Sequence, residues 1–179
     1  NIVRNFYNLG VLEIVCDIDE ENLKKVTGQY PGVKVTRDFH EIINNPEITA
    51  VAVVTPSHTH YKMVHAMLDA GKNVYVEKPI STVAQEAKDL TQVAHEKGLV
   101  LMVGHLLLYH PAVNRLKMLI EEGALGDIIY AQSDRLNVNF FKNDRSVMWD
   151  LAPHDVSMMS YVTGKDPVRV ISAVGCSSE

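Results

Sequence analysis

The sequence has few cysteines and lacks any long apolar run, and each shortage excludes a class of protein. Cys16 and Cys176 are the two cysteines, and they lie far apart in strand-like segments. Two such residues indicate small buried hydrophobes in a reducing cytoplasm rather than a disulfide framework. No CxxC or HExxH pattern occurs, so the sequence predicts no metal site. No apolar run reaches the ~20 residues that a bilayer-spanning helix needs.

The chain also lacks a cluster of lysines and arginines, and its formal net charge is -5. Nucleic acid and anionic membranes are therefore excluded as expected partners, and a small molecule is favoured. The chain is rich in apolar residues, which make up 46% of its 179 residues. This content suffices for one full domain, or for one domain and part of another.

The first two-thirds of the chain alternates short apolar runs with helical patterns. Expected strands are residues 11–16, 33–36, 50–54, 74–76 and 99–103. Expected helices are residues 1–9, 20–30, 38–44 with Asp38 as cap, 57–70 and 82–97. Strands that are apolar throughout and separated by helices indicate a parallel sheet covered on both faces. The sequence therefore predicts an α/β domain over residues 1–104, a doubly wound sheet of the Rossmann type.

The pattern changes after Gly104. Residues 111–122 and 153–163 have the pattern of helices, and residues 127–139 and 168–175 alternate like half-buried strands. We expect the start of an α+β domain over residues 105–179, with an open mixed or antiparallel sheet. Since a sheet of two strands has little independent stability, we expect further sequence after residue 179.

Three motifs follow one another in a recognisable order. The Thr55-Pro56 turn comes first, then Glu77-Lys78-Pro79 at the end of an apolar strand, and then the cluster from Trp149 to Asp155. This order resembles the Gfo/Idh/MocA family of nicotinamide-dependent oxidoreductases, with matching segments across nearly the whole chain. The resemblance implies an NAD-dependent dehydrogenase that moves a hydride between nicotinamide and a secondary alcohol carbon of a sugar.

One part of that family's pattern is absent, namely the glycine-rich phosphate loop. Asp17 stands where the ribose-binding acid of a dinucleotide site is expected, and counting back ~20 residues leads upstream of Asn1. We therefore expect the first strand and the loop to precede this chain. Taken alone, Asp17 is more simply a residue that ends a strand and caps a helix. The carboxylates of Asp17 and Asp19, which flank Ile18, would repel a 2′-phosphate, so NAD is favoured over NADP.

The resemblance also implies which other residues contact the cofactor. They are Ile18, Thr55, Pro56, Ser57, His58, His60, Glu77, Lys78 and His105. Without the resemblance, the loop from Thr55 to His60 is a turn in which Ser57 caps the next helix. His58 and His60 also suggest a metal pair, but no third ligand stands at a suitable spacing.

The resemblance assigns catalysis to Lys78, His154 and Asp150. A lysine cation polarises the oxygen that gains or loses the hydride, and a histidine takes the hydroxyl proton near neutral pH. Asp150 would orient that ring or bind substrate, and Pro153 suits a helix's first turn, which places His154 at the helix entry. The simpler alternatives are a solvated lysine, a capping aspartate and a buried histidine. The family pattern is Asp-x-Gly-x-His, and this chain has Ala152 in place of the glycine.

The block Gly104-His105-Leu106-Leu107-Leu108-Tyr109-His110-Pro111 bears on the substrate. With the cluster around His154, it resembles the nucleotide-sugar subgroup, such as UDP-N-acetylglucosaminuronate 3-dehydrogenases. Tyr109, Lys78, Asp150 and His154 would then line the sugar site. The alternatives are a dehydrogenase of polyols or free sugars and a non-catalytic, cofactor-sensing regulator. The family also implies a homo-oligomer, a dimer or a tetramer.

Overall fold

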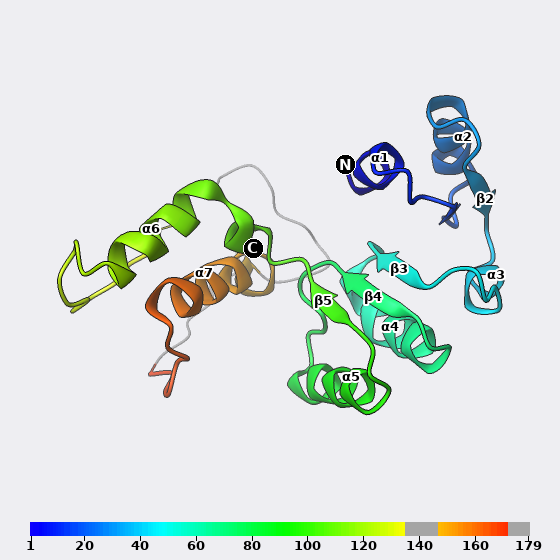
Figure 1. Cartoon of the computed structure of the whole chain (residues 1–179). Helices are drawn as coiled ribbons and strands as arrows, with labels where there is room; N and C mark the ends of the chain where they lie inside the picture. The colour runs from blue at the N-terminus through cyan, green and yellow to red at the C-terminus, as the bar shows by residue number, and fades with distance from the viewer. Residues whose placement is uncertain (135–146, 172–179) are drawn as a thin grey trace, which may run out of the picture. The chain divides into compact units, whose positions relative to one another are not determined.

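A computed structural model describes residues 1–134 and 147–171 of the chain (Figure 1). The chain folds into two compact units. The first comprises Asn1–Val53, Lys62–Tyr75 and Asp89–Leu101. The second comprises Val54–Tyr61, Val76–Lys88 and Met102–Glu179.

Strands and helices alternate up to residue 103, as the sequence predicts. The strands are β1 (Ile14–Cys16), β2 (Lys34–Thr36), β3 (Ala50–Val53), β4 (Asn73–Val76) and β5 (Leu101–Val103). The helices are α1 (Ile2–Asn8), α2 (Glu20–Gln29), α3 (His40–Ile43), α4 (His60–Asp69) and α5 (Ala84–Glu96), and a 3-10 turn, η1 (Ser57–Thr59), precedes α4. Local signals set several of these ends. The Asp19 carboxylate accepts a bond from Glu21 N and caps α2, and Gly10 follows α1 with φ of 69°.

The strands pair in parallel, which confirms the predicted sheet type, but they form two sheets. In the first, β1 lies beside β2 with Ile14 opposite Lys34. The second has the order β3-β4-β5, and its bonds Val74 N to Val100 O and Gly104 N to Val76 O advance in the same direction along both strands. Within the described residues no strand pairs the first sheet with the second.

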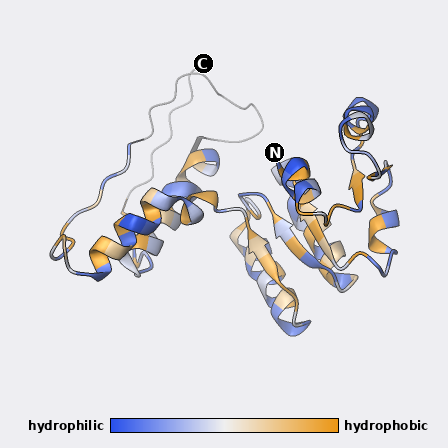
Figure 2. Cartoon of the chain, turned by 45° about the horizontal axis from the view of Figure 1, so that its top comes forward, coloured by the Kyte–Doolittle hydropathy of each residue, from blue (hydrophilic) through white to orange (hydrophobic). Residues whose placement is uncertain are grey.

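The core of the first unit is aliphatic. Its most deeply buried side chains include Val64, Met67, Leu68, Val74 and Leu90. Figure 2 shows hydrophobic residues concentrated along the strands, as expected for a sheet covered by helices. Lys72 is buried as well, at 3% exposure, and its Nζ donates to the carbonyl oxygens of Asn45 and Ile48 at 2.7 and 2.8 Å. A buried ammonium group is tolerated here because carbonyl acceptors replace its water.

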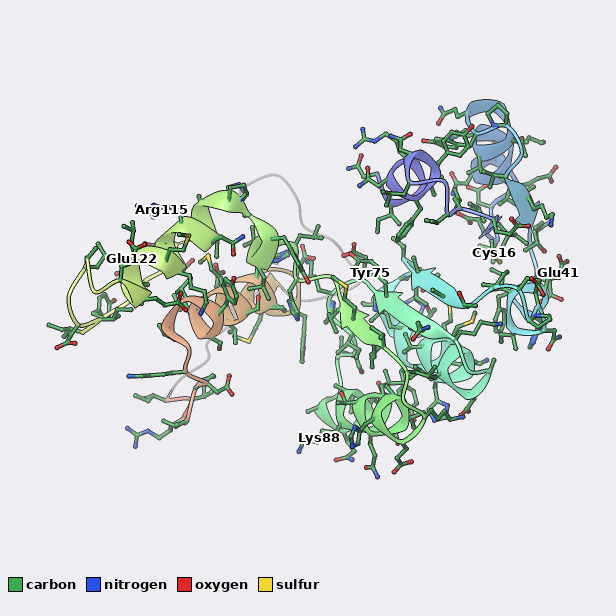
Figure 3. All side chains as sticks on the ribbon, viewed as in Figure 1. Cys16, Glu41, Tyr75, Lys88, Arg115 and Glu122 are labelled. Carbon is green, nitrogen blue, oxygen red and sulfur yellow. The ribbon has the colours of Figure 1, made fainter. Side chains whose placement is uncertain are left out.

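The regular elements of the later part of the chain are helices, within the residues that the structure describes. A 3-10 turn, η2 (Leu106–Tyr109), leads into α6 (Pro111–Glu121), which packs against η2 and α7 (Val147–Thr163). Tyr161 joins the two helices, because its hydroxyl donates to Asn114 Oδ1 at 2.7 Å and its carbonyl accepts from Lys117 Nζ at 3.0 Å. Arg115 and Glu122, which are labelled in Figure 3, lie 3.9 Å apart at the exposed side of α6.

Two sequence-based expectations for this part are wrong. Helix α7 begins at Val147, so Pro153 lies inside the helix and not in its first turn. Proline removes one helical hydrogen bond, but packing against α6 favours a continuous helix.

The described parts of the two predicted late strands, residues 127–134 and 168–171, belong to no strand. Ile129 is 95% exposed and Val168 is fully exposed. A strand needs a partner for its backbone hydrogen bonds, and the described residues pair no strand with these segments. Residues 135–139 and 172–175 of those predicted strands lie outside the described residues. No helix within the described ranges has both the length and the apolar character needed to cross a membrane.

Candidate active site

Lys78 and Asp150, which the sequence assigns to catalysis, are in direct contact. Lys78 follows β4 directly after Glu77, and the Lys78–Pro79 peptide is cis. Lys78 Nζ lies 2.9 Å from Asp150 Oδ1 and 2.5 Å from the Asp150 carbonyl oxygen. The two side chains are only 15% and 21% exposed. The ammonium group is therefore held by two acceptors in a partly desolvated place, where its charge acts more strongly than in water.

His154 stands one helical turn beyond this contact. Asp150 and His154 are four residues apart in α7, so they share one face of the helix. The His154 carbonyl accepts a bond from Ser157 Oγ at 3.1 Å. His154 thus lies within the helix and not at its entry, and α7 presents an acid and a histidine on the face that contacts Lys78.

His105 follows β5, and the positive charge of Lys78 acts on its side chain. Its Nδ1 is buried and has no hydrogen-bond partner among the described residues. Burial lowers the pKa of His105 below its ordinary value of 6.5, and the charge of Lys78 lowers that pKa further. The lowered pKa favours a neutral imidazole near neutral pH, and the predicted role of His105 in the cofactor site stays a prediction.

The loop that follows β3 is closed by its own hydrogen bonds. Thr59 Oγ1 donates to the Pro56 carbonyl at 2.7 Å and lies 2.7 Å from Thr55 Oγ1. Because the single Thr59 hydroxyl proton is used by Pro56, Thr55 is the donor in the second bond. Thr59 is not singled out by the sequence within the loop from Thr55 to His60, although its four-residue spacing from Thr55 is a signal.

The other residues of this loop differ in exposure. His58 and Pro56 are exposed, whereas Ser57 is buried within η1, where Pro56 and not Ser57 occupies the N-cap position. The expected capping role of Ser57 is therefore not observed for this turn. His60 is completely buried, and its two ring nitrogens each lie 2.7 Å from a backbone carbonyl, those of Pro79 and Thr55. His60 is therefore held between two backbone carbonyls, and its predicted cofactor contact stays a prediction.

Asp17 and Ile18 lie in the first unit, after β1. The Asp17 carboxylate accepts from Asp19 N at 2.9 Å and from Asn22 Nδ2 at 3.1 Å, which orders the turn into α2. The side chain of Ile18 is 83% exposed. Asp17 thus follows the strand and orders the turn, but the cap of α2 is Asp19 and not Asp17. The cofactor role of Asp17 stays a prediction.

Glu77 and Tyr109 are the remaining predicted site residues. Glu77 is partly buried, and Tyr109 is 65% exposed at the end of η2, the turn that packs against α7.

Within the part of the chain that the structure describes, no group of three or more His, Cys, Asp or Glu residues is placed to hold a metal ion.

Comparison with known proteins identifies the family. Residues 3–105 match the oxidoreductase family with an NAD-binding Rossmann fold, and residues 113–179 match the GFO/IDH/MocA C-terminal domain. The chain belongs to the Gfo/Idh/MocA family. The predicted family and the Rossmann-type fold are therefore confirmed.

Relatives of this chain are named for different substrates. UDP-N-acetylglucosamine 3-dehydrogenase from Acidithiobacillus ferrooxidans is 35% identical over 74% of this chain and 41% of its own length. The NADP(+) scyllo-inositol 2-dehydrogenase from Bacillus subtilis is 34% identical over 75% of this chain and 37% of its own length. The chain thus spans less than half the length of these curated relatives.

A solved structure supports the fold. Scyllo-inositol dehydrogenase from Lactobacillus casei, solved with bound NAD(H) and scyllo-inositol, superposes with a TM-score of 0.71. The match covers 86% of this chain and 48% of that one, at 23% identity, so it shows a shared fold.

Proposed function

We propose that the protein carrying this chain is an NAD-dependent dehydrogenase that oxidises or reduces a secondary alcohol carbon of a sugar. The observation that supports this most is the contact of Lys78 with Asp150, one helical turn from His154. A structural ion pair alone would need no histidine beside it. A lysine, a carboxylate and a histidine on adjacent elements form a set that can manage the oxygen and the proton of an alcohol.

Each of these residues has a distinct role in the proposal. Lys78 directs its ammonium group at the reacting oxygen and stabilises negative charge there. His154 accepts the hydroxyl proton during oxidation and returns it during reduction. Asp150 holds the lysine through its carboxylate and its carbonyl, so that the ammonium group keeps one orientation.

The residues proposed for the cofactor fit a dinucleotide because they directly follow strands. Asp17 follows β1, Thr55 to His58 follow β3, Glu77 and Lys78 follow β4, and His105 follows β5. Ligands of open parallel sheets bind at the carboxyl ends of the strands. NAD, when bound, supplies the site that accepts or gives the hydride. Asp17 and Asp19 favour NAD over NADP through their negative charge. We assign residues 1–104 to cofactor binding and residues 105–179 to substrate binding and oligomerisation.

For the substrate we propose a nucleotide sugar. The relative that is 35% identical is named for such a substrate, and the leucines at positions 106–108 leave fewer polar groups for a free polyol. Tyr109 is exposed at the end of the same turn and is proposed to contact the sugar. The relative that is named for scyllo-inositol makes a polyol the second candidate.

We also propose that the protein is cytoplasmic and forms a homo-oligomer. Light scattering of the purified protein would test the oligomeric state.

The test uses protein expressed from the complete reading frame that contains this sequence. NADH absorbance is followed with NAD and a panel of UDP-N-acetylglucosaminuronate, UDP-N-acetylglucosamine, scyllo-inositol and free hexoses. NADH formation with the nucleotide sugars alone supports the proposal, and formation with the inositol alone moves the substrate to the polyol class. His154→Ala should lower turnover by about 10²–10⁴-fold while NADH still binds. Tight NADH binding without turnover of any alcohol would overturn the enzyme assignment and favour a cofactor-sensing regulator.

A further inference from the structure

Tyr161, in the last turn of α7, contacts α6 through its hydroxyl, its ring and its carbonyl. The hydroxyl donates to Asn114 Oδ1 at 2.7 Å, and the carbonyl oxygen accepts from Lys117 Nζ at 3.0 Å. The same ammonium group lies 4.8 Å from the centroid of the Tyr161 ring. Asn114 and Lys117 are three positions apart in α6, so they share one face of that helix. One residue of α7 therefore meets two polar groups of α6, where the two helices lie side by side (Figure 1).

These contacts set the position of α7 along α6. Apolar contacts are non-directional, so they tolerate small displacements of one helix along the other. A hydrogen bond weakens steeply away from its preferred distance and angle, and a cation is attracted only over the face of a ring. Because α7 ends at Thr163, the Tyr161 carbonyl is among the last four of the helix, which have no helical donor. The Lys117 ammonium group supplies that donor and places a positive charge at the negative end of α7.

Tyr161 stands on the same face of α7 as the two proposed site residues of that helix. His154 lies seven positions before it and Asp150 eleven, which is close to two and three whole turns. Lys78 holds α7 at Asp150, with its Nζ 2.9 Å from the carboxylate, and Tyr161 holds the helix against α6. Pro153 removes one backbone hydrogen bond of the helix directly before His154, so the Lys78 contact alone holds the later turns less firmly. His154 therefore lies between two points of attachment.

We propose that Tyr161 is a positioning residue for His154, because it sets the place of α7 along α6 through Asn114 and Lys117. This inference rests on the proposed function, in which His154 accepts the hydroxyl proton of the substrate. A displacement of about 1 Å at a reacting group costs about 100-fold in rate, so a contact two helical turns away affects turnover. Tyr161 itself touches neither substrate nor cofactor in this proposal.

The first test does not depend on activity. It uses protein from the complete reading frame with 13C-labelled histidine, in which Tyr161→Phe removes the hydroxyl and keeps the ring and the backbone carbonyl. Two-dimensional 1H–13C NMR reports the histidine rings, and His154→Ala identifies the His154 signal. We expect that signal to shift or broaden in Tyr161→Phe, while the signal of His95, exposed on α5, stays unchanged. An unchanged His154 signal in the folded variant would overturn the inference.

The second test separates positioning from a general loss of structure. Tyr161→Phe should lower kcat by about 10–100-fold and leave KM within about twofold. In the His154→Ala background the same change should alter kcat by less than about twofold, because the group through which Tyr161 acts is gone. Tyr130→Phe is the matched control, since its hydroxyl donates to Gln132 Oε1 within one exposed segment, and it should leave kcat unchanged.

Asn114 allows the same test from the other helix. Asn114→Leu removes the acceptor and should reproduce the loss of kcat, also where Tyr161→Phe does not fold. Asn114→Asp retains an oxygen that accepts from Tyr161 and should keep most of the activity. The losses of Asn114→Leu and Tyr161→Phe should not multiply in the double variant, because each removes the same hydrogen bond. A double variant with the full product of both losses would contradict the proposal.

The outcomes distinguish this inference from the proposed function. Equal losses of kcat from Tyr161→Phe with and without His154 would overturn the positioning role and leave the dehydrogenase assignment intact. A His154 signal that depends on the Tyr161 hydroxyl, in a protein that oxidises no alcohol, would support the positioning and overturn the proposed function.

Discussion

Lys78 and Asp150, which are 72 positions apart in sequence, are joined through both the side chain and the backbone of the aspartate. The amine lies 2.9 Å from the carboxylate oxygen and 2.5 Å from the carbonyl oxygen. Because one of the acceptors is a backbone atom of α7, the position of the amine depends on that helix as well as on charge attraction. Lys78 is therefore oriented by the fold before any substrate binds.

Lys78→Met should reduce kcat by about 10²–10³-fold, because methionine retains much of the side-chain volume and loses the charge that stabilises the reacting oxygen. NADH affinity, measured by fluorescence titration, should change little. Lys88→Met is the control, since Lys88 is exposed on α5 (Figure 3). Turnover close to that of the unmodified protein would remove Lys78 from the mechanism.

Asp150→Ala should lower the free energy of unfolding by about 1–3 kcal/mol, the typical cost of losing a hydrogen bond to a charged group. Asp150→Asn should cost less, because its amide oxygen still accepts from Lys78. At 15% and 21% exposure the pair is only weakly screened by solvent. Urea unfolding of both variants measures the difference. An alanine variant as stable as the parent would show that the carboxylate contact adds nothing to the fold.

His105 should titrate below pH 6.5, because burial and then the charge of Lys78 lower its pKa. The unfolded chain consequently takes up this proton at a higher pH than the folded chain does. The contribution of His105 to stability is then constant above pH 6.5 and declines as the pH falls below it. An NMR titration of the ring C–H signal measures the midpoint.

The same NMR titration of His105 in the Lys78→Met variant tests the contribution of the lysine charge to the pKa. The midpoint should rise toward 6.5 without reaching it, since burial, the larger cause, is unchanged. A midpoint that does not move would exclude Lys78 as a source of the shift.

Asp17→Asn should reduce the preference for NAD over NADP while the turn into α2 stays intact. The amide oxygen can still accept from Asp19 N, so the substitution removes charge and keeps the local hydrogen bond. The ratio of kcat/KM for the two cofactors is the measurement, with Asp38→Asn after β2 as the control of equal charge. An unchanged ratio would leave Asp17 as a turn residue alone.

The sequence by itself determined the elements and the motifs. Apolar runs defined five strands, because the burial of a strand depends on residues within a few positions of each other. The motif order also identified the family. The catalytic roles predicted for Lys78, Asp150 and His154 come from that resemblance.

Only the tertiary structure decided how these pieces meet. It placed Pro153 inside a long helix, since packing against α6 outweighs the local preference of proline for a first turn. It joined Lys78 to Asp150 and buried His60 between two carbonyls, contacts that no spacing rule predicts. The physical reason is that such contacts depend on the packing of distant elements, whose free energy is not contained in any short segment of the chain.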